Sequence, residues 1–263
     1  MSTKFLNKRR RDLLLLCFFL VIARFLSLGL NVSYLLSTLF FFGIPAAYLS
    51  LRVSKGQIKK ALVFASLCLI PAVTVDILAV SSGAWIVPET VFPFRLFQII
   101  PLEDLIWAFL MVYLLILVYE YFLDEGKNLF LIKKPLKYCL LFLALSAIFS
   151  ILLIYLKPRL LYVPYFYFVI GAVFALAPML LFIILYPKLI SKFFKAGILF
   201  FLLLIVFELT GLTLHHWEFP GPDFVGWINV FGQRFPIEEF VFFVILFSSA
   251  ALSYYEFLYD DRK

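Results

Sequence analysis

Charged residues are scarce in this sequence. Only 15% of its 263 residues are charged, whereas 65% are hydrophobic and 20% are aromatic. Soluble domains typically contain ~25% charged and ~45–50% apolar residues, so this composition cannot supply a water-facing surface. We therefore expect an integral membrane protein. Because lipid satisfies no backbone hydrogen bonds, only a helix bundle or a closed barrel can span a bilayer, and the long apolar runs favour all-α structure.

Residue patterns for metals and nucleotides are also missing. The only histidines are the adjacent His215 and His216, and the three cysteines form no CxxC pair, so we predict neither a metal site nor a disulfide framework. The sequence contains no GxGxxG, no GxxxxGK[ST] and no DxxxD motif. We therefore expect no bound cofactor. The net charge of +7 reflects the placement of cations along a membrane chain, and we expect no nucleic-acid partner.

Apolar runs of about 20 residues predict the membrane-spanning helices. Eight such runs cover residues 13–30, 33–51, 58–80, 102–122, 137–156, 162–186, 196–214 and 237–258. Seven spans remain an alternative if the uncharged turn near Asn31 is not a boundary. Most of the 23 Lys and Arg residues fall on the cytoplasmic side if the N-terminus is placed there. We predict a multi-pass cell-membrane protein with both termini cytoplasmic and two long loops, about 81–100 and 215–235, on the opposite face.

One pattern occurs twice in the chain. Asp76 precedes Trp85 by nine residues, and Glu208 precedes Trp217 by the same spacing. A loop then leads to Pro-Leu-Glu-Asp in the first case and to Pro-Ile-Glu-Glu in the second. A gene duplication is the simplest explanation.

The duplication predicts the domain organisation. Beyond the loop the two copies keep an offset of 135 residues, which matches Tyr119 with Tyr254. Each copy contains four predicted spans, so both enter the membrane from the same side as parallel repeats. We predict a first repeat at 1–124, a cytoplasmic basic linker at 125–136 and a second repeat at 137–263.

The acids of the repeated motif are the candidate catalytic residues. They are Glu103, Asp104, Glu238 and Glu239, and they are accompanied by Asp76 and Glu208 in the preceding helix of each repeat. Proline followed by acids also suits an ordinary helix N-terminus, which is the structural alternative. Acids within a membrane are nevertheless costly and usually mark function. Crowded carboxyls favour one protonated group beside an ionised one, as acid/base chemistry requires.

Other side chains near these acids are candidate supporting or pocket residues. They are Trp85, Trp217, Arg95, Arg234, His215 and His216. The tryptophans can stabilise a carbocation by cation–π attraction, or they can form an aromatic belt at the membrane interface. The arginines lower the pKa of nearby carboxyls, and the histidines either relay protons or lie at the interface. For Glu120 and Glu256, near the opposite helix ends, we expect solvation or pairing with basic neighbours.

The motif residues resemble those of a known family. The segment Pro236-Ile237-Glu238-Glu239-Phe240 and its degenerate copy Pro101-Leu102-Glu103-Asp104 resemble the membrane-integral lycopene cyclases, whose two related domains occur either as separate subunits or fused. The chain looks like a fused form. The resemblance implies that the four motif acids are essential for carotenoid ring closure. Asp104 stands where the motif has a second glutamate in the other copy.

The resemblance implies a lycopene β-cyclase that closes the ends of lycopene to β-ionone rings, giving γ-carotene and then β-carotene. This isomerisation needs a general acid and a general base but no redox cofactor. We take Glu238 or Glu103 as the acid and another motif carboxylate as the base. The expected partners are lycopene or another acyclic carotenoid, membrane lipid and other enzymes of carotenoid synthesis. A proton-coupled transporter and a carotenoid end-group hydratase remain alternative functions.

Overall fold

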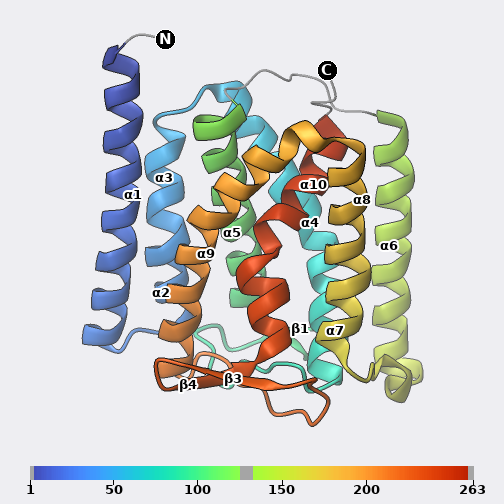
Figure 1. The fold of residues 1–263 in the computed structure, drawn as a ribbon. Coiled ribbons are helices and arrows are strands. Elements are labelled where there is room, and N and C mark those ends of the chain that lie inside the picture. The colour runs from blue at the N-terminus through green and yellow to red at the C-terminus, as the bar shows by residue number, and fades with distance from the viewer. Residues whose placement is uncertain (1–2, 125–132, 260–263) are drawn as a thin grey trace.

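The computed structural model describes residues 3–124 and 133–259, which form an upright bundle of helices (Figure 1). The first half contains α1 (Thr3–Leu30), α2 (Tyr34–Thr38), η1 (Leu39–Gly43), α3 (Ile44–Ser50), α4 (Lys55–Ser81), α5 (Leu102–Tyr119) and η2 (Glu120–Asp124). The second contains α6 (Lys133–Leu156), η3 (Pro158–Leu161), α7 (Phe166–Ile170), η4 (Gly171–Leu176), α8 (Ala177–Leu185), η5 (Pro187–Leu189), α9 (Ile190–Thr213), η6 (Glu239–Ile245) and α10 (Phe247–Tyr259). Residues 125–132 of the predicted linker at 125–136 lie outside the described residues. Helix α6 begins directly after them, at Lys133.

Several of these helices are long and apolar enough to cross a membrane. Among the described residues they are Lys8–Leu30, Lys55–Ser81, Leu102–Asp124, Phe166–Leu185 and Pro187–Thr213. A sixth candidate is the pair η6 and α10, which is bent by 51°. Two shorter apolar helices cover Tyr34–Ser50 and Leu141–Leu156. The predicted helical membrane class is confirmed, while the full number of spans stays a prediction.

Two of the helices widen into a π-helical turn just before a proline. Pro45 lies at the start of α3 and follows η1, and Pro178 lies at the start of α8 and follows η4. Proline has no backbone N–H, and its ring crowds the carbonyl four residues earlier. A π-helical turn before the proline relieves this crowding. Gly171 in η4 is also required sterically, since a Cβ atom there would lie 2.2 Å from the ring of Phe242.

Two short β-hairpins close one end of the bundle. In the first, β1 (Arg95–Leu96) pairs antiparallel with β2 (Ile100–Pro101). In the second, β3 (Trp227–Val230) pairs antiparallel with β4 (Gln233–Pro236). Both hairpins lie at the end opposite to the start of α1 and the end of α10 (Figure 1). The two long loops are therefore on the same side of the bundle, and the assignment of the other side to the cytoplasm stays a prediction.

A backbone bridge joins the two loops to each other. The N–H of Ile86 donates to the carbonyl of Glu218, and the N–H of Glu218 donates to the carbonyl of Ile86, both at 2.9 Å. The N–H of Gly221 also donates to the carbonyl of Gly83 at 2.8 Å. A Cβ atom on Gly221 would lie 2.6 Å from that carbonyl oxygen, so this close approach requires glycine.

Buried polar side chains join the two halves at the opposite end. Tyr119 donates a hydrogen bond to Glu256, and Tyr255 donates one to Glu120. Lys60 Nζ lies 3.0 Å from Glu120 Oε1, so the expected pairing of Glu120 with a basic neighbour is confirmed. The expected solvation is wrong, because Glu120 and Glu256 are only 0% and 2% exposed.

Tyr119 and Tyr255 make similar contacts, because each donates to a buried glutamate of the other half. The sequence pattern matches Tyr119 with Tyr254, and that alignment of the two halves stays a prediction. The hydroxyl of Tyr254 instead donates to the backbone carbonyl of Phe174 at 2.7 Å.

Candidate active site

A cavity of about 100 Å³ lies inside the bundle and receives side chains from both halves of the chain. Four carboxyls line it: Asp76 from α4, Asp104 from α5, Glu208 from α9 and Glu239 from η6. All four are buried. The structure therefore brings together four of the six acids that the sequence analysis selected.

The two acids of each motif point in different directions. Asp104 and Glu239 line the cavity, whereas Glu103 and Glu238 do not. Adjacent residues on a helix do not share a face, so the two acids of one motif cannot enter the same space. Only the second acid of each motif reaches the cavity.

The first acid of each motif holds a loop instead. Glu103 Oε1 accepts the backbone N–H groups of Val91 and Phe92 at 2.6 and 3.0 Å. Glu238 Oε1 accepts the backbone N–H of Val225 in the second loop. In both glutamates the Oε2 atom is buried and has no hydrogen-bond partner among the described residues. These acids fix the loops that cover the cavity.

Two tyrosines that the sequence analysis missed also line the cavity. The hydroxyl of Tyr34 at the start of α2 lies near Asp104, and that of Tyr167 in α7 lies near Glu239. They were overlooked because each lies in a long apolar run far from the motifs. One signal was present: Tyr34 precedes Pro45 by eleven residues, and Tyr167 precedes Pro178 by the same spacing.

The predicted tryptophans form aromatic walls of the cavity. The ring of Trp85 lies 5.5 Å from that of Tyr167, and the ring of Trp217 lies 5.6 Å from that of Tyr34. Each tryptophan thus packs on the tyrosine of the other half. Trp217 Nε1 donates to Glu208 Oε1 at 3.0 Å. Both tryptophans line the cavity. This position differs from that of an aromatic belt, whose rings contact only the membrane interface.

Small residues and further rings complete these walls. A Cβ atom on Gly211 would lie 2.0 Å from the ring of Trp217, so the glycine makes room for the indole. Trp107 and Phe243 face each other from the two halves with ring centroids 5.5 Å apart. Apart from the four carboxyls and Val87, every side chain that lines the cavity is aromatic.

The two predicted arginines have different positions. Arg95 donates to the backbone carbonyls of Val87 and Ile99, and it lies close enough to Asp104 to attract its carboxylate. The guanidinium of Arg234 stacks over the ring of Trp227, 4.9 Å from its centroid. Neither arginine lines the cavity. Arg95 acts on Asp104 electrostatically from outside it.

The two predicted histidines lie outside the cavity. His215 is exposed and has a positive φ of 55° in the turn after α9. His216 is buried and hydrogen-bonds to the hydroxyl of Ser37 at 3.1 Å. Burial lowers the pKa of His216 to about 4, so its ring is neutral near pH 7. The structure gives no support to a proton relay through these side chains.

The four cavity acids form two pairs. Asp76 interacts electrostatically with Asp104, and Glu208 interacts with Glu239. Among the described residues, no three His, Cys, Asp or Glu side chains are close enough together to hold a metal ion. Two carboxyls that share a buried site resist ionising together, so each pair is suited to holding and passing one proton.

The match to known proteins falls on the first half of this site. Residues 31–122 match the lycopene cyclase family model. The matched segment is about a third of the chain, and it includes Tyr34, Asp76, Trp85, Glu103 and Asp104. No curated protein and no solved structure matches the chain. The similarity to lycopene cyclases therefore includes the first-half wall of the cavity.

Proposed function

We propose that the protein is a carotenoid cyclase of the fused lycopene cyclase type, with one active site built from both halves. The observation that carries the proposal is the cavity, where acids and aromatic rings from the family-matched half meet a similar set from the other half. The first half supplies Tyr34, Asp76, Trp85 and Asp104, and the second supplies Tyr167, Glu208, Trp217 and Glu239.

Reciprocal contacts support the proposed parallel repeats. Ile86 and Glu218 exchange backbone hydrogen bonds at the hairpin end. At the other end, the hydrogen bond from Tyr119 to Glu256 is mirrored by the bond from Tyr255 to Glu120. Reciprocal contacts are what a twofold axis produces. An axis that passes through both sets of contacts runs along the bundle, as it does in parallel repeats. On this basis we propose that all eight helical segments cross the membrane.

The proposed reaction begins with proton transfer from a cavity carboxyl to the terminal double bond of the polyene. This gives a tertiary carbocation, which the neighbouring double bond attacks to close a six-membered ring. A carboxylate then removes a proton, and an alkene is regenerated. No atom is gained or lost and no electron is exchanged, so the step is an isomerisation that proceeds by acid/base chemistry. Loss of the proton that leaves the new double bond conjugated with the polyene gives the proposed β-ring.

We assign the acid and base roles to the second acid of each motif. Asp104 and Glu239 line the cavity, and each has a buried acid and a tyrosine beside it. Glu103 and Glu238 hold the loops and are positioning residues in this proposal, whereas the sequence interpretation took one of them as the acid. The aromatic walls stabilise the cation and exclude water, which would otherwise add to it.

Pigment analysis tests this proposal. The gene is expressed in lycopene-producing cells, and the extracted carotenoids are separated and measured by mass and visible absorption. We expect products of unchanged mass that absorb at shorter wavelength, with γ-carotene before β-carotene. Added water mass would show a hydratase, and unchanged lycopene beside correctly inserted protein would overturn the proposal and favour transport. Glu89→Gln, which changes an exposed acid of the first loop, is the matched control for variants of the cavity acids.

A further inference from the structure

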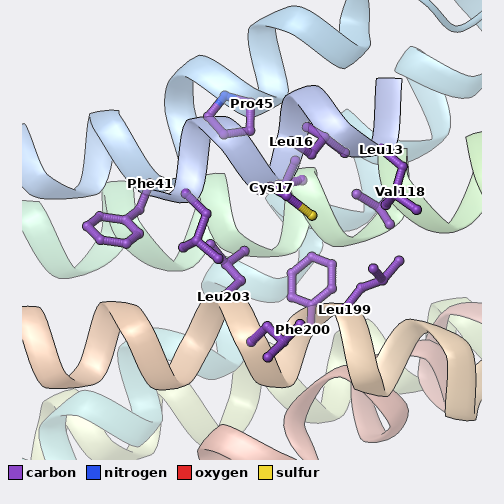
Figure 2. A pocket seen from close by; sticks show the side chains of 12 residues that line it. Leu13, Leu16, Cys17, Phe41, Pro45, Val118, Leu199, Phe200 and Leu203 are labelled. Carbon is purple, nitrogen blue, oxygen red and sulfur yellow. The ribbon is translucent and has the colours of Figure 1, made fainter. Parts of the chain in front are cut away.

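A second cavity lies between α1, α3, α5 and α9 (Figure 2). Its volume is about 70 Å³, and every side chain that lines it is apolar. Leu13 and Cys17 of α1 face Phe200 and Leu203 of α9 across it, and the sulfur of Cys17 points towards α9 in Figure 2. We call this space the α1–α9 groove. Cys17 is exposed at its edge, so the groove meets the surrounding lipid in a membrane-embedded protein.

The groove and the acid cavity approach each other at a pair of rings. Phe41 lines the groove, and Phe207 lines the acid cavity. Their ring centroids are 5.3 Å apart. Leu203 and Phe207 are one helical turn apart on α9, so the groove begins where the acid cavity ends. Phe207 also packs against Phe42, with ring centroids 4.8 Å apart, so joining the two spaces requires these rings to move.

The acid cavity is small for a carotenoid. Pockets that enclose whole small molecules usually measure ~300–1,000 Å³, whereas this cavity is about 100 Å³. In the proposed function, the carotenoid therefore extends beyond it. The rest of that molecule is comparable in length to the ~30 Å hydrocarbon core of a bilayer, and it must lie in apolar surroundings.

We propose that the α1–α9 groove holds the part of the polyene chain nearest to the carotenoid end that lies in the acid cavity. The identity of the ligand rests on the proposed function. The entirely apolar lining suits a hydrocarbon and offers nothing to a polar solute. From Leu203 to Leu199 the groove runs along α9 away from the hairpin end, so the polyene lies roughly along the helices. Helix α1 forms the outer wall of the groove, and its Leu14 and Phe18 are 70% and 56% exposed.

Cys17 provides a direct test of occupancy. A protein that keeps only this cysteine carries Cys68→Ala and Cys139→Ala, and a matched protein keeps only Cys68, which does not line the groove. Both are placed in lipid nanodiscs and treated with N-ethylmaleimide, with and without lycopene, and labelling is followed by intact mass. We expect lycopene to slow labelling of Cys17 several-fold and to leave Cys68 unchanged. Equal labelling of Cys17 with and without lycopene in a protein that cyclises it overturns the groove and leaves the proposed function standing.

The opposite result is equally informative. Protection of Cys17 without any cyclised product supports the groove and refutes the proposed function. A second variant measures binding in the active protein: Cys17→Trp fills the groove, and Phe18→Trp places the same ring on the lipid side of α1. We expect Cys17→Trp to raise KM at least about tenfold with kcat nearly unchanged, the pattern of lost binding. Equal KM values for the two tryptophan variants would contradict the proposal.

Discussion

Both ends of the bundle bury acids between the two halves, but they use them differently. At the hairpin end, four carboxyls and several aromatic rings surround a cavity. At the opposite end, Glu120 and Glu256 each accept a hydrogen bond from a tyrosine of the facing helix, and Lys60 pairs with Glu120. Burial of an acid is therefore not enough to indicate chemistry. The space beside the carboxyl distinguishes an acid that can meet a substrate from one that joins two helices.

Removing the cavity acids should have the largest effect on turnover. Asp104→Asn and Glu239→Gln should each reduce the initial rate of cyclisation by ~10²–10⁴-fold, because a general acid or base typically contributes this much. The fold should persist, since an amide replaces a carboxyl of similar shape. Rates are measured on purified protein in lipid, with size-exclusion profiles as the check on folding. Rates near that of Glu89→Gln would place the reaction elsewhere.

The opposite end should respond in stability and not in chemistry. Glu120→Ala leaves Lys60 buried without its carboxylate, and loss of one partner from a buried ion pair costs ~3–5 kcal/mol. We expect a clear fall in the melting temperature in detergent, with nearly normal turnover per folded molecule. Tyr254→Phe, which removes an exposed hydroxyl from α10, the helix that faces Glu120, is the control. Loss of turnover without loss of stability would mean that this end takes part in the reaction.

The first acid of each motif offers a finer comparison. Glu103→Gln and Glu238→Gln keep an oxygen that can accept the loop N–H groups, so their effect should be smaller than that of Asp104→Asn and Glu239→Gln. We expect a loss of about tenfold, because a hydrogen bond to a charged group contributes ~1.5–3 kcal/mol and is only weakened here. Full kinetics of the four variants in one lipid decide the order. If the order is reversed, Glu103 or Glu238 is the acid after all.

His216 should show the smallest effect, and only in acid. Its pKa is lowered to about 4 by burial, below the ~6.5 of an unfolded chain, so protonation favours the unfolded state. The protein should therefore lose stability as the pH falls from about 6.5 towards 4, and His216→Gln should reduce that loss. His215→Gln, at the exposed neighbour, is the control. Thermal unfolding across this pH range measures the effect, and a large change in turnover at pH 7 would return His216 to the active site.

The sequence carries enough information to predict where the acids meet. Asp76 and Glu208 have the same distance to a tryptophan, and the motifs follow at helix starts, so helical geometry alone brings these residues to one end of the bundle. The difference between Asp104 and Glu103 was not predictable, because it depends on which helix face meets a neighbour. The similar contacts of Tyr119 and Tyr255 were not predicted either, although Tyr119-Glu120 recurs as Tyr255-Glu256, one residue beyond the 135-residue offset of the motifs.

The packing of each tryptophan against the other half has a consequence for how the two halves evolve. Trp85 packs on Tyr167, and Trp217 packs on Tyr34, so each half supplies a tryptophan that packs against the tyrosine of the other half. A gene cut between α5 and α6 would encode two polypeptides, neither of which closes a complete cavity alone. Such polypeptides would have to be made together and to recognise each other before either had any use. Whether joined or separate, the two halves must therefore change in step during evolution.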